Sequence, residues 1–283
     1  MVLSTTTQAD KPGDTLHFTH PITDTPYYAE RGKYFHSLLE LALSKSGQAY
    51  SISTVGMPAM SESRSAIFLE KGRYNVHWLM TNNAHETRLL PVRIPLYRGL
   101  IGWRLLFIHQ ENTALFSKVN DLDSLLRLKG TQGTDWPDAP VLIASGFKVQ
   151  LTQDWSSMVA YVTRKRVEHF PRSVIEIWKE SKQLQHEPLR VEPHLVIHYP
   201  AAYYFFVSQK HPRHAQALEQ GLKNALADGS FEALFESTFG EDIRRSKLAN
   251  RTVIHINNPM LPPHTPLAQK NLWFDPAKQS SAL

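Results

Sequence analysis

Three short segments carry the side chains best suited to binding chemistry, and the first runs from residue 80 to residue 88. Arg88 ends it as a planar fork that matches a carboxylate or a phosphate. Thr81 and Asn83 can add neutral hydrogen bonds a few residues before it. The alternative is that Arg88 pairs with Glu86 or caps a helix at the surface.

The second segment is Gly133-Thr134-Asp135-Trp136-Pro137. Glycine lets a backbone approach a ligand closely, and a helix that starts after it offers N–H groups to an anion. Pro137 suits the first turn of such a helix. The alternative is an ordinary helix start, in which Asp135 occupies the same N–H groups.

The third segment runs from Glu168 through His169, Phe170 and Pro171 to Arg172. Glu168 can bind an ammonium group and Arg172 an acid, while the alternative is a surface turn. Four aromatic residues could stack on a bound molecule, although most large aromatic residues form the core. These are Tyr27, Tyr28, Trp103 and Trp136.

Strand and helix patterns alternate in the part of the chain that must position the first segment. Residues 16–20, 49–55 and 74–80 alternate as strands, and residues 30–46 and 61–72 have helical spacing. This order predicts an α/β fold with a parallel sheet covered by helices on both sides. Ligands of such sheets bind beyond the carboxyl ends of the strands, where the first segment begins.

Prolines and glycines mark two crossings between lobes, near residues 92–100 and 198–201. Between them we expect a strand at 103–108, a turn at 131–137 that opens a helix, and an extended piece at 167–171. The cleft between two such lobes is the default ligand site.

The crossings divide the chain into a discontinuous lobe 1 and a continuous lobe 2. We assign residues 14–97 and 199–283 to lobe 1, residues 98–198 to lobe 2, and residues 1–13 to a flexible N-terminal segment. A chain of 283 residues is long enough for two such cores. We expect each lobe to hold a mostly parallel sheet flanked by helices.

Composition excludes several classes of protein. The chain has no cysteine, so it holds no disulfide framework and no Cys-ligated metal. Lysine and arginine number 31 against 26 acidic residues, and this scattered excess does not indicate nucleic-acid binding. The longest apolar run, residues 201–207, is far shorter than the roughly 20 residues of a membrane-spanning helix.

Cofactor and targeting motifs are absent as well. Glycine-rich nucleotide loops and the zincin spacing do not occur, and the 14 histidines form no ligand set with an acidic third member, so we expect no metal and no cofactor. The polar start of the sequence lacks a secretory signal. It fits either a cytoplasmic protein or an exported chain from which a signal is missing.

The three segments, in this order and spacing, resemble the type 2 periplasmic solute-binding proteins, specifically the polar amino acid-binding branch known as solute-binding protein family 3. The resemblance covers roughly residues 14–262. Residues 97–104, 169–172 and 257–262 differ from transport-type members and are similar to a divergent bacterial subgroup. The fold implied is two-lobed, with two hinge crossings.

The resemblance also implies roles for individual residues. Arg88 matches the arginine that clamps the ligand carboxylate, Thr81 and Asn83 match hydroxyl and backbone ligands, and Gly133-Thr134 matches the glycine–threonine pair of the second lobe. Glu168 is the nearest match to the acid that binds the ligand amino group.

What the resemblance implies for the whole chain is a periplasmic monomer that captures a small polar, anionic or amino acid-like ligand by hinge closure. Its partner would be a membrane transporter of the ABC class or a sensor protein, with no membrane insertion and no catalysis. Two alternatives stay open, an enzyme acting on a small organic acid and a ligand-sensing module. His85, His169 or Glu168 would serve such an enzyme as acid or base.

Overall fold

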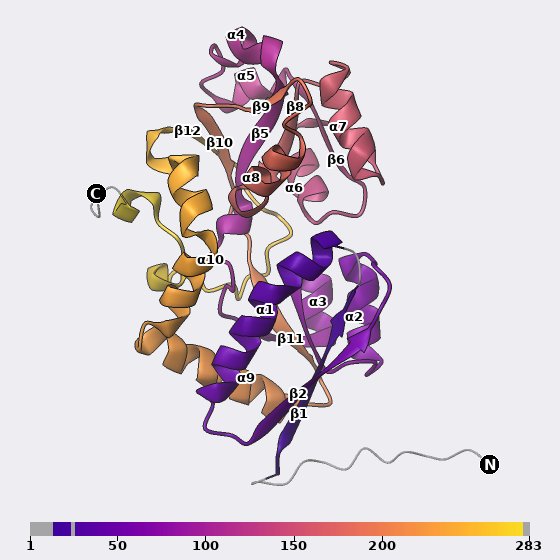
Figure 1. The fold of residues 1–283 in the computed structure, drawn as a ribbon, viewed down its shortest axis with the longest axis vertical. Helices are drawn as coiled ribbons and strands as arrows, with labels where there is room; N and C mark the ends of the chain where they lie inside the picture. The colour runs from indigo at the N-terminus through magenta and orange to yellow at the C-terminus, as the bar shows by residue number, and fades with distance from the viewer. Residues whose placement is uncertain (1–13, 24–25, 280–283) are drawn as a thin grey trace, which may run out of the picture.

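Two α/β lobes lie one above the other along the long axis of the molecule, which confirms the predicted fold class (Figure 1). The computed structural model describes residues 14–23 and 26–279, so the predicted segment 1–13 lies outside it. The helices are α1 (Pro26–Ser44), α2 (Glu62–Glu70), α3 (Asn83–Arg88), α4 (Thr113–Phe116), α5 (Leu122–Leu126), α6 (Asp138–Ala144), α7 (Trp155–Thr163), α8 (Val174–Gln183), α9 (Pro212–Ala227) and α10 (Ser230–Ser246). The strands are β1 (Leu16–Ile22), β2 (Tyr50–Gly56), β3 (Val76–Met80), β4 (Leu89–Val92), β5 (Trp103–His109), β6 (Lys129–Gly133), β7 (Lys148–Thr152), β8 (His169–Ser173), β9 (Leu189–Val191), β10 (Leu195–His198), β11 (Tyr203–Ser208) and β12 (Thr252–His255).

The central strand of lobe 1, β11, is apolar on both faces because helices cover both. Tyr203, Phe205 and Val207 belong to the main core, against α1 and α9. Tyr204 and Phe206 point the other way, into a smaller core with α2. This alternation follows from the two-residue period of a strand.

The lobe 2 sheet is mixed, and lobe 1 holds a two-stranded parallel sheet and a three-stranded antiparallel sheet, so the prediction of a mostly parallel sheet in each lobe is wrong. In lobe 1, β1 pairs with β2 in parallel, but β11 runs antiparallel to both β3 and β4. In lobe 2 the order is β12-β10-β5-β8-β6-β7, and β5 runs antiparallel to β10, β8 and β9. The reversed strands, β5 and β11, are the ones that enter a lobe directly from a crossing.

The two predicted crossings pack against each other where the lobes join. The first links β4 to β5 and the second links β10 to β11. Tyr199 donates its backbone N–H to the carbonyl of Gly102 at 3.2 Å. A Cβ on Gly102 would lie 2.0 Å from the Tyr199 oxygen, so only glycine permits this approach.

The C-terminal part of the chain does not stay in lobe 1 as expected for residues 199–283. Helix α10 packs on α9 of lobe 1 and also on α8 of lobe 2 (Figure 1). Strand β12 then pairs in parallel with β10 at the edge of the lobe 2 sheet. A third connection therefore joins the lobes, because β10 has a free edge there that β12 fills.

The expected turn at 131–137 begins instead as a strand, β6, which runs to Gly133. Two glycines in five residues hide this strand from sequence reasoning. Gly130 is needed because a Cβ there would lie 2.5 Å from the ring of His169 on the neighbouring strand β8. The same close contact buries His169 in the lobe 2 core.

His169 gives a first testable prediction about pH. Neither of its ring nitrogens has a hydrogen-bond partner among the described residues, and burial lowers its pKa to about 4. The side chain is protonated near pH 6.5 in the unfolded chain but stays neutral at that pH in the folded chain. The free energy of unfolding therefore falls as the pH is lowered. In urea denaturation, the free energy of unfolding should fall between pH 7.5 and pH 5 in both proteins. The fall should be about 2 kcal/mol smaller in the His169→Leu variant than in the parent.

A matched control for this experiment is His264→Gln, because His264 is exposed. That variant should follow the pH dependence of the parent chain. Equal pH dependence in the His169→Leu variant and the parent would contradict the assignment of a neutral, buried His169.

Candidate functional site

A pocket of about 210 Å³ lies between the lobes, and both lobes line it. We name it the interlobe pocket. This volume is below the roughly 300–1,000 Å³ of sites that hold drug-sized ligands, so the pocket suits a small molecule. Lobe 1 contributes Arg31, Met60, Ser61, Glu62, Met80 and Tyr203, and lobe 2 contributes Ile101, residues 133–138, Gln153, Arg172 and Glu176.

Four of the residues singled out in the sequence meet in this pocket: Gly133, Thr134, Trp136 and Arg172. Trp136 folds back on Gly133, where a Cβ would lie 2.6 Å from the indole. The Arg172 guanidinium carbon lies 4.4 Å from the centre of a Trp136 ring, a cation–π contact. The Thr134 N–H already donates to the carbonyl of Thr152 at 3.0 Å, so it is not reserved for a ligand.

The structure does not bring Arg88 to this pocket. It ends α3, half-exposed, with its guanidinium 3.7 Å from the carboxylate of Glu70. Asn83 is exposed on the first turn of the same helix. Thr81 is buried and donates its hydroxyl to Glu86 at 2.7 Å. The capping of α3 by Asn82 explains this placement, because the helix begins at once after β3 and turns Arg88 towards α2.

Glu168 lies at the far end of lobe 2 rather than in the cleft. It directly precedes β8 and accepts the backbone N–H of Lys129 at 2.6 Å. The pocket lies at the other end of β8, where Arg172 is. Tyr27 belongs to the first turn of α1, and its side chain lies outside the described part of the chain.

A cluster of buried charges forms the floor of the interlobe pocket. Arg104 is fully buried and lies 2.8 Å from Asp138, which also accepts the Tyr199 hydroxyl at 2.5 Å. Arg172 is fully buried as well, and its fork holds Glu180 with contacts of 2.6 and 2.8 Å. Both guanidiniums therefore have acidic partners within lobe 2, in Asp138 and Glu180.

Glu176 connects this cluster to lobe 1. Its carboxylate lies 3.3 Å from Arg172 and 3.6 Å from Arg104, and 3.7 Å from Arg31 on α1. Burial by itself raises the pKa of this carboxyl, but Arg172, Arg104 and Arg31 outweigh burial and lower the pKa to about 2. Glu176 is therefore ionised at neutral pH, and the contact with Arg31 joins the two lobes by charge.

Charged pocket residues that were missed in the sequence include Arg31, Glu62 and Glu176. Each had a usable signal. Arg31 and Glu62 belong to the helices that follow β1 and β2, at the strand ends where ligands bind. Glu176 belongs to a capping box with Ser173, a pattern readable as Ser-x-x-Glu.

The charge of the pocket wall is net acidic. Its charged residues are two cations, Arg31 and Arg172, and four acids, Glu62, Asp135, Asp138 and Glu176. Arg104 and Glu180 behind the wall add one charge of each sign. Glu62 accepts hydrogen bonds from the Met80 N–H at 3.0 Å and from the Tyr203 hydroxyl, and lone pairs remain on both oxygens.

Residues 14–23 and 26–279 contain no group of three or more histidine or acidic side chains arranged to hold a metal ion. No helix within the same ranges has the length and apolar character needed to cross a bilayer.

Known proteins resemble the chain in structure rather than in sequence. No protein-family model and no curated protein matches it. Among solved structures, the GluR0 ligand-binding core in complex with L-glutamate matches with a TM-score of 0.58 at 13% identity, over 81% of this chain and 100% of that one. The VFT2 domain of Bordetella pertussis BvgS matches with a TM-score of 0.59 at 14% identity, over 78% of this chain and 93% of that one. An ancestral arginine-binding protein matches with a TM-score of 0.55 at 15% identity, over 80% of this chain and 98% of that one.

The chain has the fold of the type 2 periplasmic binding proteins. This confirms the resemblance at the level of architecture. Within this fold, the interlobe pocket lies where the two lobes meet.

The buried cluster gives a second prediction. Asp138→Ala removes the partner of a fully buried guanidinium, so the free energy of unfolding should fall by about 3–5 kcal/mol. Glu70→Ala breaks the exposed pair with Arg88 and should cost less than about 1 kcal/mol. Urea denaturation of both variants provides the comparison, and similar losses in the two would contradict a stabilising role for the cluster.

Proposed function

We propose that this chain is an extracytoplasmic solute-binding protein whose interlobe pocket captures a small ligand bearing a positively charged amino group. An amino acid-like molecule is the ligand class that fits best. The observation that carries the proposal is the net acidic wall, in which Glu62 faces the pocket from lobe 1 and Asp135 from lobe 2. Both carboxylates lie outside the Arg104, Arg172 and Glu176 cluster.

The charge arrangement favours this ligand over an anion. A free anion needs a guanidinium or a set of N–H groups, and the fork of Arg172 already holds Glu180. An ammonium group instead gains charge-assisted hydrogen bonds from Glu62 and Asp135. Arg31, at the rim, is the cation that a ligand carboxylate would approach.

Hinge closure completes the proposed mechanism. The ligand would dock first on Glu62 and Tyr203 of lobe 1, and Thr134 and Trp136 of lobe 2 would then close over it. Closure requires that the ligand bind the closed form better than the open form. The Arg31–Glu176 contact supports such a closed form, since it can form only when the lobes approach.

We propose further that the closed form is recognised by a membrane transporter or a sensor protein, and that binding occurs without catalysis. The similar structures include the GluR0 core with L-glutamate, an arginine-binding protein and a histidine kinase sensor domain, which support ligand capture coupled to either outcome. The residues considered as acid or base, His85, His169 and Glu168, do not line the interlobe pocket.

A panel of small molecules tests the charge requirement. In isothermal titration calorimetry, L-arginine, L-glutamine or another amino acid should bind, and the dicarboxylate succinate should not. Glu62→Gln keeps the size of the side chain but removes its charge. This substitution should weaken the binding of the amino acid by about 30-fold or more, because its ammonium group then faces a neutral partner.

Arg88→Ala separates this proposal from the role that the resemblance implies. The structure predicts an affinity within about twofold of the parent, since Arg88 pairs with Glu70 away from the pocket. A carboxylate clamp at Arg88 predicts a loss of more than about 30-fold. Tight binding of succinate, or a loss of that size in Arg88→Ala with none in Glu62→Gln, would refute the proposed ligand class.

A further inference from the structure

The sheet of lobe 1 is split between β1 and β3. At the start of β3, Asn75 bridges the two strands, accepting the Thr19 N–H at 2.8 Å and donating to the carbonyl of His17 at 2.7 Å. Beyond Asn75, and among the strands that the structure describes, β1 pairs only with β2 and β3 pairs only with β11. Pro21 on β1 has no N–H to donate, so the ladder cannot continue across the gap.

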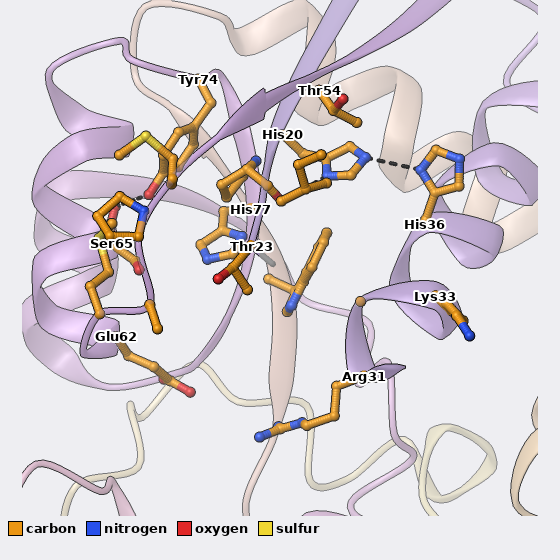
Figure 2. A pocket seen from close by; sticks show the side chains of 18 of the residues that line it. His20, Thr23, Arg31, Lys33, His36, Thr54, Glu62, Ser65, Tyr74 and His77 are labelled. Carbon is orange, nitrogen blue, oxygen red and sulfur yellow. Dashed lines mark hydrogen bonds between the residues drawn. The ribbon is translucent and has the colours of Figure 1, made fainter. Parts of the chain in front are cut away.

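A second cavity, of about 470 Å³, occupies this split. We name it the lobe 1 pocket. Figure 2 shows His20 and His77 between the α2 side, with Ser65 and Glu62, and the α1 side, with His36 and Arg31. Its volume lies within the range of roughly 300–1,000 Å³ that holds drug-sized ligands.

The lining of the lobe 1 pocket includes six aromatic or imidazole rings and two thioethers. The ring of Trp78 stacks on Phe35 at 4.7 Å and lies 4.9 Å from His77 and 5.4 Å from His20. Met57 and Met60 complete the lining on the side of the β2–α2 connection. Planar rings and polarisable sulfur both favour contact with an aromatic group.

One polar atom in this wall lacks a partner. Nδ1 of His77 is buried and makes no hydrogen bond within the described residues. Burial lowers the pKa of His77 to about 3, with His20 and His85 acting in the same direction, so the ring is neutral at pH 7. A neutral imidazole can accept one hydrogen bond, and a buried acceptor without a partner is costly. In the tautomer that leaves Nδ1 unprotonated, a ligand group that donates an N–H or O–H would supply the missing partner.

The lobe 1 pocket opens towards the interlobe pocket. Arg31, Met60, Glu62 and Tyr203 line both cavities. Glu62 in particular faces both, and in the proposed function it binds the ligand amino group. A group attached to that amino-bearing centre can extend directly into the split sheet.

We propose that the ligand is an amino acid or amine with a planar aromatic side group that carries a hydrogen-bond donor. The amino end binds at Glu62, and the aromatic group enters the lobe 1 pocket against Trp78 and His77. This inference rests on the proposed function, because it extends the same ligand. An indole or a phenol ring has the shape and the donor that the pocket requires.

Three probes separate the two parts of this ligand: L-tryptophan carries both, L-alanine only the amino acid part, and indole only the ring. Calorimetry should show L-tryptophan binding at least about 100-fold more tightly than L-alanine, because a buried indole removes a large apolar surface from water. L-phenylalanine should bind about tenfold or more weakly than L-tryptophan, since it leaves His77 without a partner.

Gly32 provides a matched pair of variants. It lies on α1 and lines the lobe 1 pocket, and a Cβ there would meet only Trp78, at 3.9 Å. Gly32→Ala therefore fits beside Trp78 and favours the helix, and it is the size control for a larger side chain at this position. Gly32→Leu projects into the cavity and should weaken L-tryptophan by about tenfold or more while L-alanine is unaffected.

The outcomes distinguish the inference from the function on which it rests. Equal affinity for L-tryptophan and L-alanine, or a Gly32→Leu variant that leaves their ratio unchanged, would overturn the aromatic side group and leave the solute-binding proposal standing. Failure of every amino-bearing probe would overturn the proposed function itself. Binding of indole without L-tryptophan would overturn the two-part ligand.

Discussion

One carboxylate, that of Glu176, is the point on which the charge balance of the molecule depends. It lies against Arg104 and Arg172 of its own lobe and against Arg31 of the other lobe. Two buried guanidiniums in lobe 2 require internal counter-charges, because an unpaired charge inside a core is costly. Asp138 supplies another of these charges. Because the lobe 2 arginines are paired with carboxylates of their own lobe, the pocket above them keeps an excess of negative charge.

This arrangement links the chemistry of the pocket to the movement of the lobes. Arg31 lines the interlobe pocket, the lobe 1 pocket and a third cavity of about 730 Å³ between α1, α8 and α10. A ligand that enters between the lobes therefore changes the surroundings of a cation that joins them. The Gly102–Tyr199 contact keeps the two central crossings together, as the proposed closure of the lobes requires.

Much of the fold could be predicted from sequence, because hydrophobic period and glycine or proline punctuation are local signals. The direction of the strands could not be predicted, because it depends on which lobe the chain leaves. The pairing of β12 with lobe 2 could not be predicted either, because it uses a free sheet edge that no local pattern encodes. In the site, Gly133-Thr134 was predictable from a close backbone approach. Arg88 was not, because a single capping residue, Asn82, decides where its helix starts and which way its side chain points.

Closure of the two lobes around an amino-bearing ligand is the central claim, and an interlobe distance tests it most directly. The chain has no cysteine, so spin labels can be placed on exposed positions of each lobe through Lys71→Cys and Lys148→Cys. Double electron–electron resonance should show a longer or broader distance distribution without ligand, and a shorter, narrower one with saturating L-tryptophan. Identical distributions in both conditions, with binding confirmed by calorimetry, would contradict the account.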